Sequence, residues 1–109
     1  MNPFGKMGDL GQIMKQAQKM LEDTRKVEEA LAEERIETTS GGGMVKAVVT
    51  GKGEIVEIKI DPQVVDPEDI EMLEDLIVGA VREALEQASQ LKTEKMKDIT
   101  GGMGIPGLF

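Results

Sequence analysis

The chain has 109 residues, which suits a single domain, and it contains no histidine, cysteine, tryptophan or tyrosine. These missing residue types exclude disulfides, a His/Cys metal site and the Ser–His or Cys–His pairs of nucleophilic catalysis, so we do not expect an enzyme. The formal net charge of −8, taken alone, argues against a nucleic-acid partner, because binding to phosphates requires positive charge.

A long helix over residues 10–34 is the first predicted element. Residues 1–8 contain a proline and two glycines and predict a flexible arm, after which Asp9 is a candidate N-cap with Gln12 at the spacing of a capping box. The helix then carries residues at alternating steps of three and four, namely Leu10, Ile13, Ala17, Met20, Thr24, Val27 and Leu31. This spacing indicates a narrow apolar seam on one side of the helix.

Three short strands follow, over residues 35–40, 44–50 and 54–60. The glycines at 41–43 end the first strand, and Gly51-Lys52-Gly53 predicts a tight turn between the second and the third. The simplest arrangement of the three strands is an antiparallel meander.

A second long helix is predicted after two Asp-Pro pairs. We expect Asp66 to be its N-cap and Pro67 its first residue, and we expect it to end near Asp98. Its apolar stripe consists of Ile70, Leu73, Ile77, Ala80, Val81, Ala84, Leu85, Ala88 and Leu91. The glycine-rich residues 101–109 predict a flexible tail, so the predicted single domain covers residues 9–100.

The expected fold class is α+β, with the order α-β-β-β-α and a three-stranded antiparallel sheet. At 1.5 Å per residue the helices span about 37 and 48 Å, whereas a seven-residue strand spans about 23 Å. Val48 and Ile55 also predict apolar residues on the second face of the sheet. We therefore expect a homodimer joined through the sheet region; the alternative is a monomeric sandwich with frayed helix ends.

Five segments carry short motifs in a characteristic order. They are residues 7–20 (Met-Gly-Asp-Leu-Gly-Gln-Ile-Met-Lys-Gln-Ala-Gln-Lys-Met), 42–46 (Gly-Gly-Met-Val-Lys), 58–62 (Ile-Lys-Ile-Asp-Pro), 71–77 (Glu-Met-Leu-Glu-Asp-Leu-Ile), and 94–96 (Glu-Lys-Met) with Gly-Gly-Met at 101–103. In this order they resemble the YbaB/EbfC family of bacterial nucleoid-associated proteins. The resemblance implies a pincer-shaped dimer that binds double-stranded DNA in the nucleoid with low sequence preference, without catalytic activity or a cofactor.

The charge is distributed unevenly and singles out candidate DNA contacts. Residues 1–26 carry a net charge of +2 and residues 92–109 a net +1, which leaves about −11 for the centre. The candidate DNA-binding residues are Lys15, Lys19, Arg25 and Lys26 on the first helix and Lys92, Lys95 and Lys97 on the second. A purely structural role for these basic residues stays open, because Glu22 can pair with Lys26 and because cations are favoured at the C-terminal end of a helix.

Other functions compete with DNA binding. The glutamines at 12, 16 and 18 could contact base edges or could be ordinary surface residues. The acidic residues between 61 and 69 could hold a metal ion, but a helix start explains them better. The net charge and the narrow apolar seam of the first helix would also suit a protein–protein adaptor. An enzyme would have only carboxylates and lysines for proton transfer. No apolar run approaches the roughly 18 residues of a membrane span, so we expect a cytoplasmic protein without a membrane or small-molecule partner.

Overall fold

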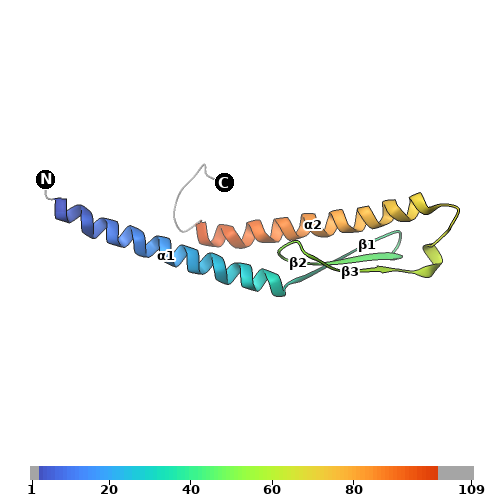
Figure 1. Cartoon of the computed structure of the whole chain (residues 1–109), viewed down its shortest axis with the longest axis horizontal. Coiled ribbons are helices and arrows are strands. Elements are labelled where there is room, and N and C mark those ends of the chain that lie inside the picture. Colours follow the sequence, from blue (N-terminus) through green and yellow to red (C-terminus); the bar gives the residue numbers. More distant parts are fainter. Residues whose placement is uncertain (1–2, 101–109) are drawn as a thin grey trace.

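Two 31-residue helices and a small sheet make up the elongated structure (Figure 1). The computed structural model describes residues 3–100, and it describes the side chains of residues 10–99. The elements are α1 (Pro3–Glu33), β1 (Arg35–Ser40), β2 (Val45–Thr50), β3 (Ile55–Ile60), the 3-10 helix η1 (Pro62–Val64) and α2 (Ile70–Thr100). This order confirms the predicted α+β class, while residues 101–109, the predicted tail, lie outside the described residues.

Helix α1 begins seven residues before the predicted start. It includes residues 3–8, so the expectation of a helix N-cap at Asp9 is wrong, while the flexibility expected of residues 1–8 stays a prediction. Pro3 is the first helical residue, where its fixed φ suits the helix and its missing N–H costs nothing. The glycines that follow weaken a helix by about 1 kcal/mol each, which does not end it.

The start of α2 also differs from the prediction, because residues 66–69 form a turn. The Asp66 carboxylate accepts a hydrogen bond from the Glu68 amide at 2.9 Å, and the Asp66 carbonyl accepts one from the Asp69 amide at 2.9 Å. Pro67 fits this turn as well as it fits a helix start. The helix begins only at Ile70, and its cap is Asp69, whose carboxylate accepts from the Met72 amide at 3.3 Å.

The sheet is the predicted antiparallel meander, with the order β1-β2-β3. Gly53 takes a φ of 87° in the turn between β2 and β3, a conformation that favours glycine. A register shift lies between Val48 and Val49, which pair with Glu57 and Ile55. Val56 is therefore an extra residue in β3, as in a β-bulge.

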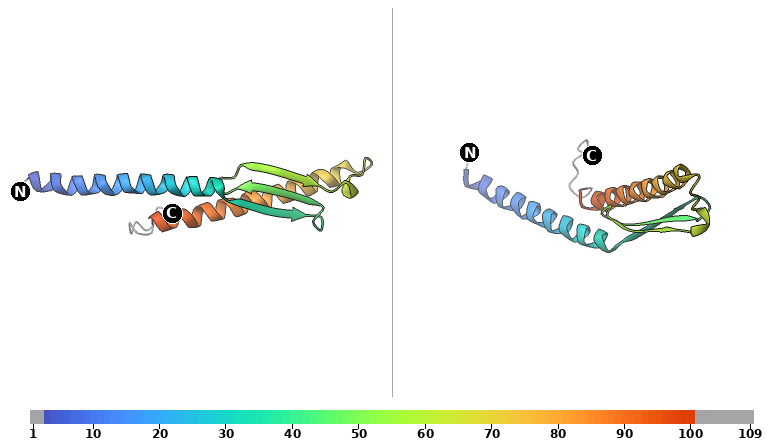
Figure 2. Two further views of the ribbon diagram at one scale, coloured as in Figure 1. Left: turned by 90° about the horizontal axis from the view of Figure 1, so that it is seen from below. Right: turned by 45° about the vertical axis from the view of Figure 1, so that its right-hand side comes forward.

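Helix α2 crosses one face of the sheet (Figure 2). The core between the helix and the sheet consists of Val45, Ala47 and Val49 of β2 with Ala80, Ala84 and Ala88 of α2. The three alanines recur every fourth residue, so one small-residue row of the helix lies against the sheet. Two hydroxyls of β1 also bind the helix backbone, since Thr38 donates to the Ala80 carbonyl and Ser40 to the Leu76 carbonyl.

We expect Thr38→Val to lower the free energy of unfolding by about 1 kcal/mol, because the shape is kept but the buried hydrogen bond to Ala80 is lost. The matched control is Thr39→Val, since Thr39 is exposed on the same strand. Urea denaturation measures both. Equal stability of the two variants would contradict a stabilising role for the Thr38 hydroxyl.

The face of the sheet turned away from α2, here called the outer face, is more polar than predicted. Lys46 lies 3.7 Å from Glu37, and Lys59 lies 3.7 Å from Glu57. Val48 shares this face, but the bulge places Ile55 opposite Val49 and so on the helix side. The expectation of Ile55 on the second face is therefore wrong, because strict alternation along a strand fails where one residue is inserted.

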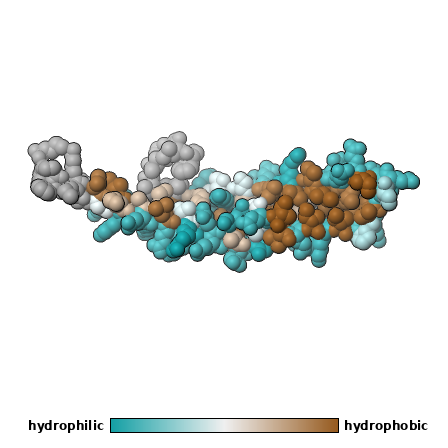
Figure 3. Space-filling view, viewed as in Figure 1, coloured by the Kyte–Doolittle hydropathy of each residue, from teal (hydrophilic) through white to brown (hydrophobic). Residues whose placement is uncertain are grey.

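An uncovered apolar surface lies instead along β3, on the side of the sheet that carries α2. Helix α2 packs on β1 and β2, so β3 remains uncovered and Ile55 is 54% exposed. We call this surface the β3 patch; it consists of Ile55, Ile58, Ile60 and Leu85. Leu85 joins it because its side chain lies beside Gly53, in the turn that precedes β3. Figure 3 shows apolar residues gathered over this part of the molecule.

Candidate nucleic-acid interface

Helix α1 projects well beyond the rest of the molecule (Figures 1 and 2). Helices α1 and α2 run in opposite directions, and the last turns of α2 lie beside the second half of α1. They enclose a pocket of about 200 Å³ lined by residues of both helices, namely Lys26, Val27, Ala30, Leu31, Glu34 and Lys95. The body of the protein therefore holds only the C-terminal half of α1.

The charges within α1 separate along the same division. Residues 10–21, here called the projecting half, carry Lys15 and Lys19 and no acidic residue. Residues 22–33 carry five acidic residues against Arg25 and Lys26. Within residues 10–33, positive charge is thus concentrated on the part of α1 that lies farther from the acidic body. Lys15 and Lys19 are both exposed, and at a spacing of four residues they lie on one face of the helix.

Arg25 and Lys26 have a more acidic environment. The Lys26 ammonium lies 3.7 Å from the Glu22 carboxylate, and this confirms the pairing that the sequence spacing allowed. Arg25 is exposed but lies in the acidic half of the helix. These two cations are therefore weaker candidates for phosphate contacts than Lys15 and Lys19.

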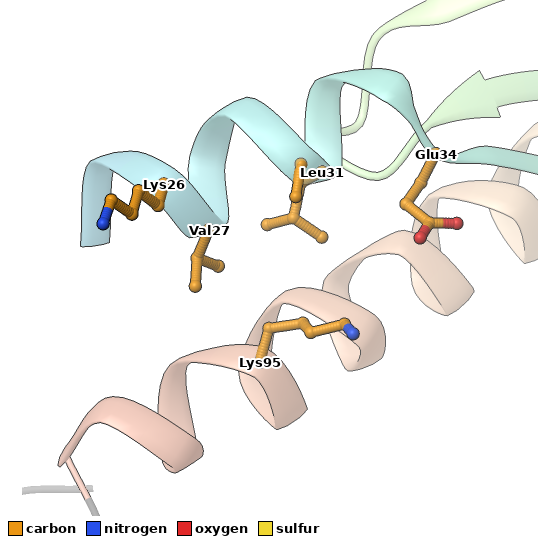
Figure 4. Close-up of a pocket in the computed structure, with 6 residues that line it drawn as sticks. Lys26, Val27, Leu31, Glu34 and Lys95 are labelled. Atoms are coloured by element: carbon orange, nitrogen blue, oxygen red, sulfur yellow. The ribbon is translucent and has the colours of Figure 1, made fainter. Parts of the chain in front are cut away.

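The lysines of α2 do not form one cluster with those of α1. Lys95 lines the same pocket as Lys26, and in Figure 4 its side chain extends along α2 toward the side on which Glu34 lies. Lys97 lies in the last turn of the helix. Lys92 instead lines a different pocket, of about 200 Å³, together with Lys52 of the turn between β2 and β3. The seven candidates thus do not form one site. Lys15 and Lys19 lie on the projecting half of α1, Lys26 and Lys95 line the pocket between the helices, and Lys92 lies beside the turn between β2 and β3.

Lys52 was missed by the sequence analysis, because a single lysine in a glycine turn carries no charge pattern. Only the packing of the turn against α2 brings it close to Lys92. Lys46 and Lys59 were missed as well, and they are paired across β2 and β3 on the outer face. Each of them lies 3.7 Å from a glutamate, so this face offers little uncompensated positive charge.

Other kinds of site receive no support within residues 3–100. This part of the chain contains no group of three or more histidine, cysteine, aspartate or glutamate side chains placed to hold a metal ion. None of its helices is both long and apolar enough to cross a membrane. The acidic residues 61, 66 and 69 instead accept hydrogen bonds from backbone amides at the ends of turns and helices.

Comparison with known proteins identifies the class. The chain is 52% identical over 103 residues to a nucleoid-associated protein of Acetivibrio thermocellus, covering 94% of this chain and 91% of that protein. It is 48% identical to a nucleoid-associated protein of Alkaliphilus metalliredigens, covering 97% of this chain and 93% of that protein. The model of the YbaB/EbfC DNA-binding family matches residues 7–103. The chain belongs to this family, as its sequence motifs indicate.

A solved structure supports the fold independently. The crystal structure of an uncharacterized protein from Helicobacter pylori matches with a TM-score of 0.63, covering 72% of this chain and 90% of that chain. The two sequences are 24% identical, so this similarity concerns the fold alone.

Proposed function

We propose that this protein binds double-stranded DNA with low sequence preference, as a homodimer on the bacterial nucleoid in the cytoplasm, and catalyses no reaction. The observation that carries the proposal is the separation of charge in α1. Lys15 and Lys19 are the two charged residues of the projecting half of α1, in a protein of a DNA-binding family, and acidic residues begin only at Glu22. The comparisons give no support to the alternative of a protein–protein adaptor.

Phosphate contacts made by lysines explain the low sequence preference. A lysine ammonium on a flexible stem binds a phosphate as a point charge and does not distinguish bases. The only aromatic residues of the chain are Phe4 and Phe109. Single-stranded nucleic acid is usually bound on several aromatic side chains, so duplex DNA fits this chain better.

The net charge of −8 is compatible with this function because charge is screened over about 10 Å at 0.1 M salt. Lys15 precedes Glu22, the first of the acidic residues 22–33, by seven residues of one helix, which corresponds to about 10 Å. The projecting half of α1 can therefore attract phosphates while the body repels them. Repulsion by the acidic body would limit phosphate contacts to the projecting half of α1. Binding would be sensitive to salt, because each lysine–phosphate contact releases counterions from the DNA.

A titration of labelled duplex DNA, followed by fluorescence anisotropy, tests the proposal. We expect binding at about 50 mM salt and a loss of affinity of tenfold or more at about 200 mM salt. Several duplexes of unrelated sequence should bind within a few-fold of one another. No binding to any duplex at about 50 mM salt would overturn the proposed function.

The homodimer accounts for the β3 patch. Four large aliphatic side chains, at positions 55, 58, 60 and 85, remain at least 36% exposed. Contiguous apolar surface of this kind is a common feature of protein interfaces. A second copy placed over the patch by a two-fold axis would bury it on both chains and would leave the two α1 helices projecting.

We expect Ile58→Glu to convert the dimer into a monomer, because it would place a charge at the centre of the buried interface. Thr39→Glu is the matched control, since it introduces the same charge on the outer face, opposite Lys46. Light scattering at micromolar concentration measures the mass of each variant. A dimeric Ile58→Glu variant would show that the interface lies elsewhere, and a wild-type monomer would overturn the homodimer.

A further inference from the structure

An apolar stripe runs along α1 and is covered over only half of its length. Near the sheet Leu31 is 1% exposed, and Val27, Thr24 and Met20 are half-buried. Farther along the projecting half, Leu21 is 72% exposed, Ile13 60% and Leu10 59%. Met14 and Ala17 are exposed on the same side. The stripe therefore continues for about 17 Å without a covering element among the described residues.

The covered part of the stripe ends where α2 ends. Helix α2 runs antiparallel to α1, and Lys95 lies beside Val27 and Ala30 in the pocket between the helices. Five residues further on, α2 ends at Thr100. At 1.5 Å per residue this point lies opposite residues 22–25 of α1. The chain thus leaves α2 directly at the uncovered part of the stripe.

We propose that residues 101–109 of this same chain bind along the apolar stripe of the projecting half of α1. Nine extended residues reach about 30 Å, which exceeds the roughly 17 Å between Leu21 and Leu10. The segment carries no charged side chain and contains four large apolar residues, namely Met103, Ile105, Leu108 and Phe109. The four large exposed apolar residues of the stripe and the four of the segment would bury one another.

The position of the lysines makes this binding compatible with DNA contact. Lys15 and Lys19 lie on the side of α1 opposite Ile13 and Ala17, as the 100° rotation per residue of a helix requires. Residues 101–109 would cover the apolar side of the projecting half and leave the lysine side exposed. A second copy of this chain is the other possible occupant of the stripe, and the test separates the two.

The absence of cysteine allows a nitroxide spin label to be attached at one position of the full chain. We choose Gly107→Cys and observe the backbone amides of the 15N-labelled protein by NMR. The label is expected to broaden the amide signals of residues 10–21 and to leave those of Gly41 to Gly43, at the far end of the sheet, unchanged. Unchanged signals in residues 10–21 would overturn the proposal.

A mixed sample identifies the chain that supplies the segment. It combines 15N-labelled chains without the nitroxide and nitroxide-labelled chains without 15N. No broadening of residues 10–21 is expected there, because each chain would cover its own stripe. Broadening of these signals in the mixed sample would overturn the proposal and assign the stripe to a second copy.

Variants of the stripe provide the matched control. Ile13→Gln combined with Leu21→Gln should abolish the broadening, since glutamine removes the apolar contact and keeps a high helix propensity. Gln12→Ala combined with Gln16→Ala changes two exposed residues outside the stripe and should keep the broadening. Equal broadening in both double variants would overturn the proposed contact, and it would do so independently of whether the protein binds DNA.

Discussion

Replacing Lys15 and Lys19 together by glutamine is expected to lower the affinity for duplex DNA by tenfold or more at about 50 mM salt. Both side chains are exposed on the projecting half of α1, which contains no acidic residue between positions 10 and 21. Each lost phosphate contact also lowers the slope of log K against log salt concentration by about 0.9. The slope should therefore fall by about 2 for each protomer in contact with the DNA. Anisotropy titrations at several salt concentrations measure both quantities.

Lys46→Gln combined with Lys59→Gln is the matched control for this result. It removes the same number of positive charges, but from two lysines of the outer face that each lie 3.7 Å from a glutamate. We expect its affinity for DNA to stay within a few-fold of the wild type. An equal loss in the two double variants would mean that net charge alone governs binding and that Lys15 and Lys19 are not the contacts.

Gly51→Ala is expected to lower the free energy of unfolding by about 2 kcal/mol. A Cβ atom at this position would lie 2.7 Å from the Leu31 carbonyl oxygen and 2.9 Å from a Leu31 methyl group. The Gly51 amide also donates a hydrogen bond to that carbonyl at 2.9 Å, so the backbone cannot move away without breaking it. Urea denaturation followed by circular dichroism measures the loss.

Gly79→Ala serves as the control for this steric argument. A Cβ atom at position 79 meets nothing within 4 Å, and the residue lies within α2. The substitution should raise the stability by up to about 1 kcal/mol, because alanine favours a helix over glycine. If Gly51→Ala were as stable as Gly79→Ala, the close contact between the turn and α1 would be contradicted.

The order of elements could be predicted from the sequence because each element has a clear periodicity. The three strands and the Gly51-Lys52-Gly53 turn lie where the alternation of apolar residues and the positions of the glycines predicted them. The two helix starts could not be predicted, because Pro3 and Pro67 are each compatible with a turn and with a helix. Ile55 was assigned to the wrong face because an inserted residue in β3 leaves no local signal.

The candidate site was predicted only in part, for a different physical reason. Lys15 and Lys19 could be selected from the charge pattern of one helix, and their role in DNA binding stays a prediction. The contacts that surround the other lysines depend on tertiary packing. Lys95 lines a pocket with Lys26, and Lys92 lines another with Lys52, only because α2 runs back along both α1 and the sheet. The end of α2 at Thr100 also determines which part of α1 projects.

The hydrogen bond between Gly51 and Leu31 fixes the angle at which α1 leaves the sheet, and the long helix converts a small change of this angle into a large displacement of its other end. Lys15 lies 16 residues from Leu31, which corresponds to about 24 Å of helix. A rotation of about 10° at this junction would therefore displace Lys15 by about 4 Å, more than the length of a hydrogen bond. Small changes in the packing around one buried glycine would thus be amplified at the end of the arm. The stiffness of that junction therefore limits how far Lys15 and Lys19 move relative to the sheet.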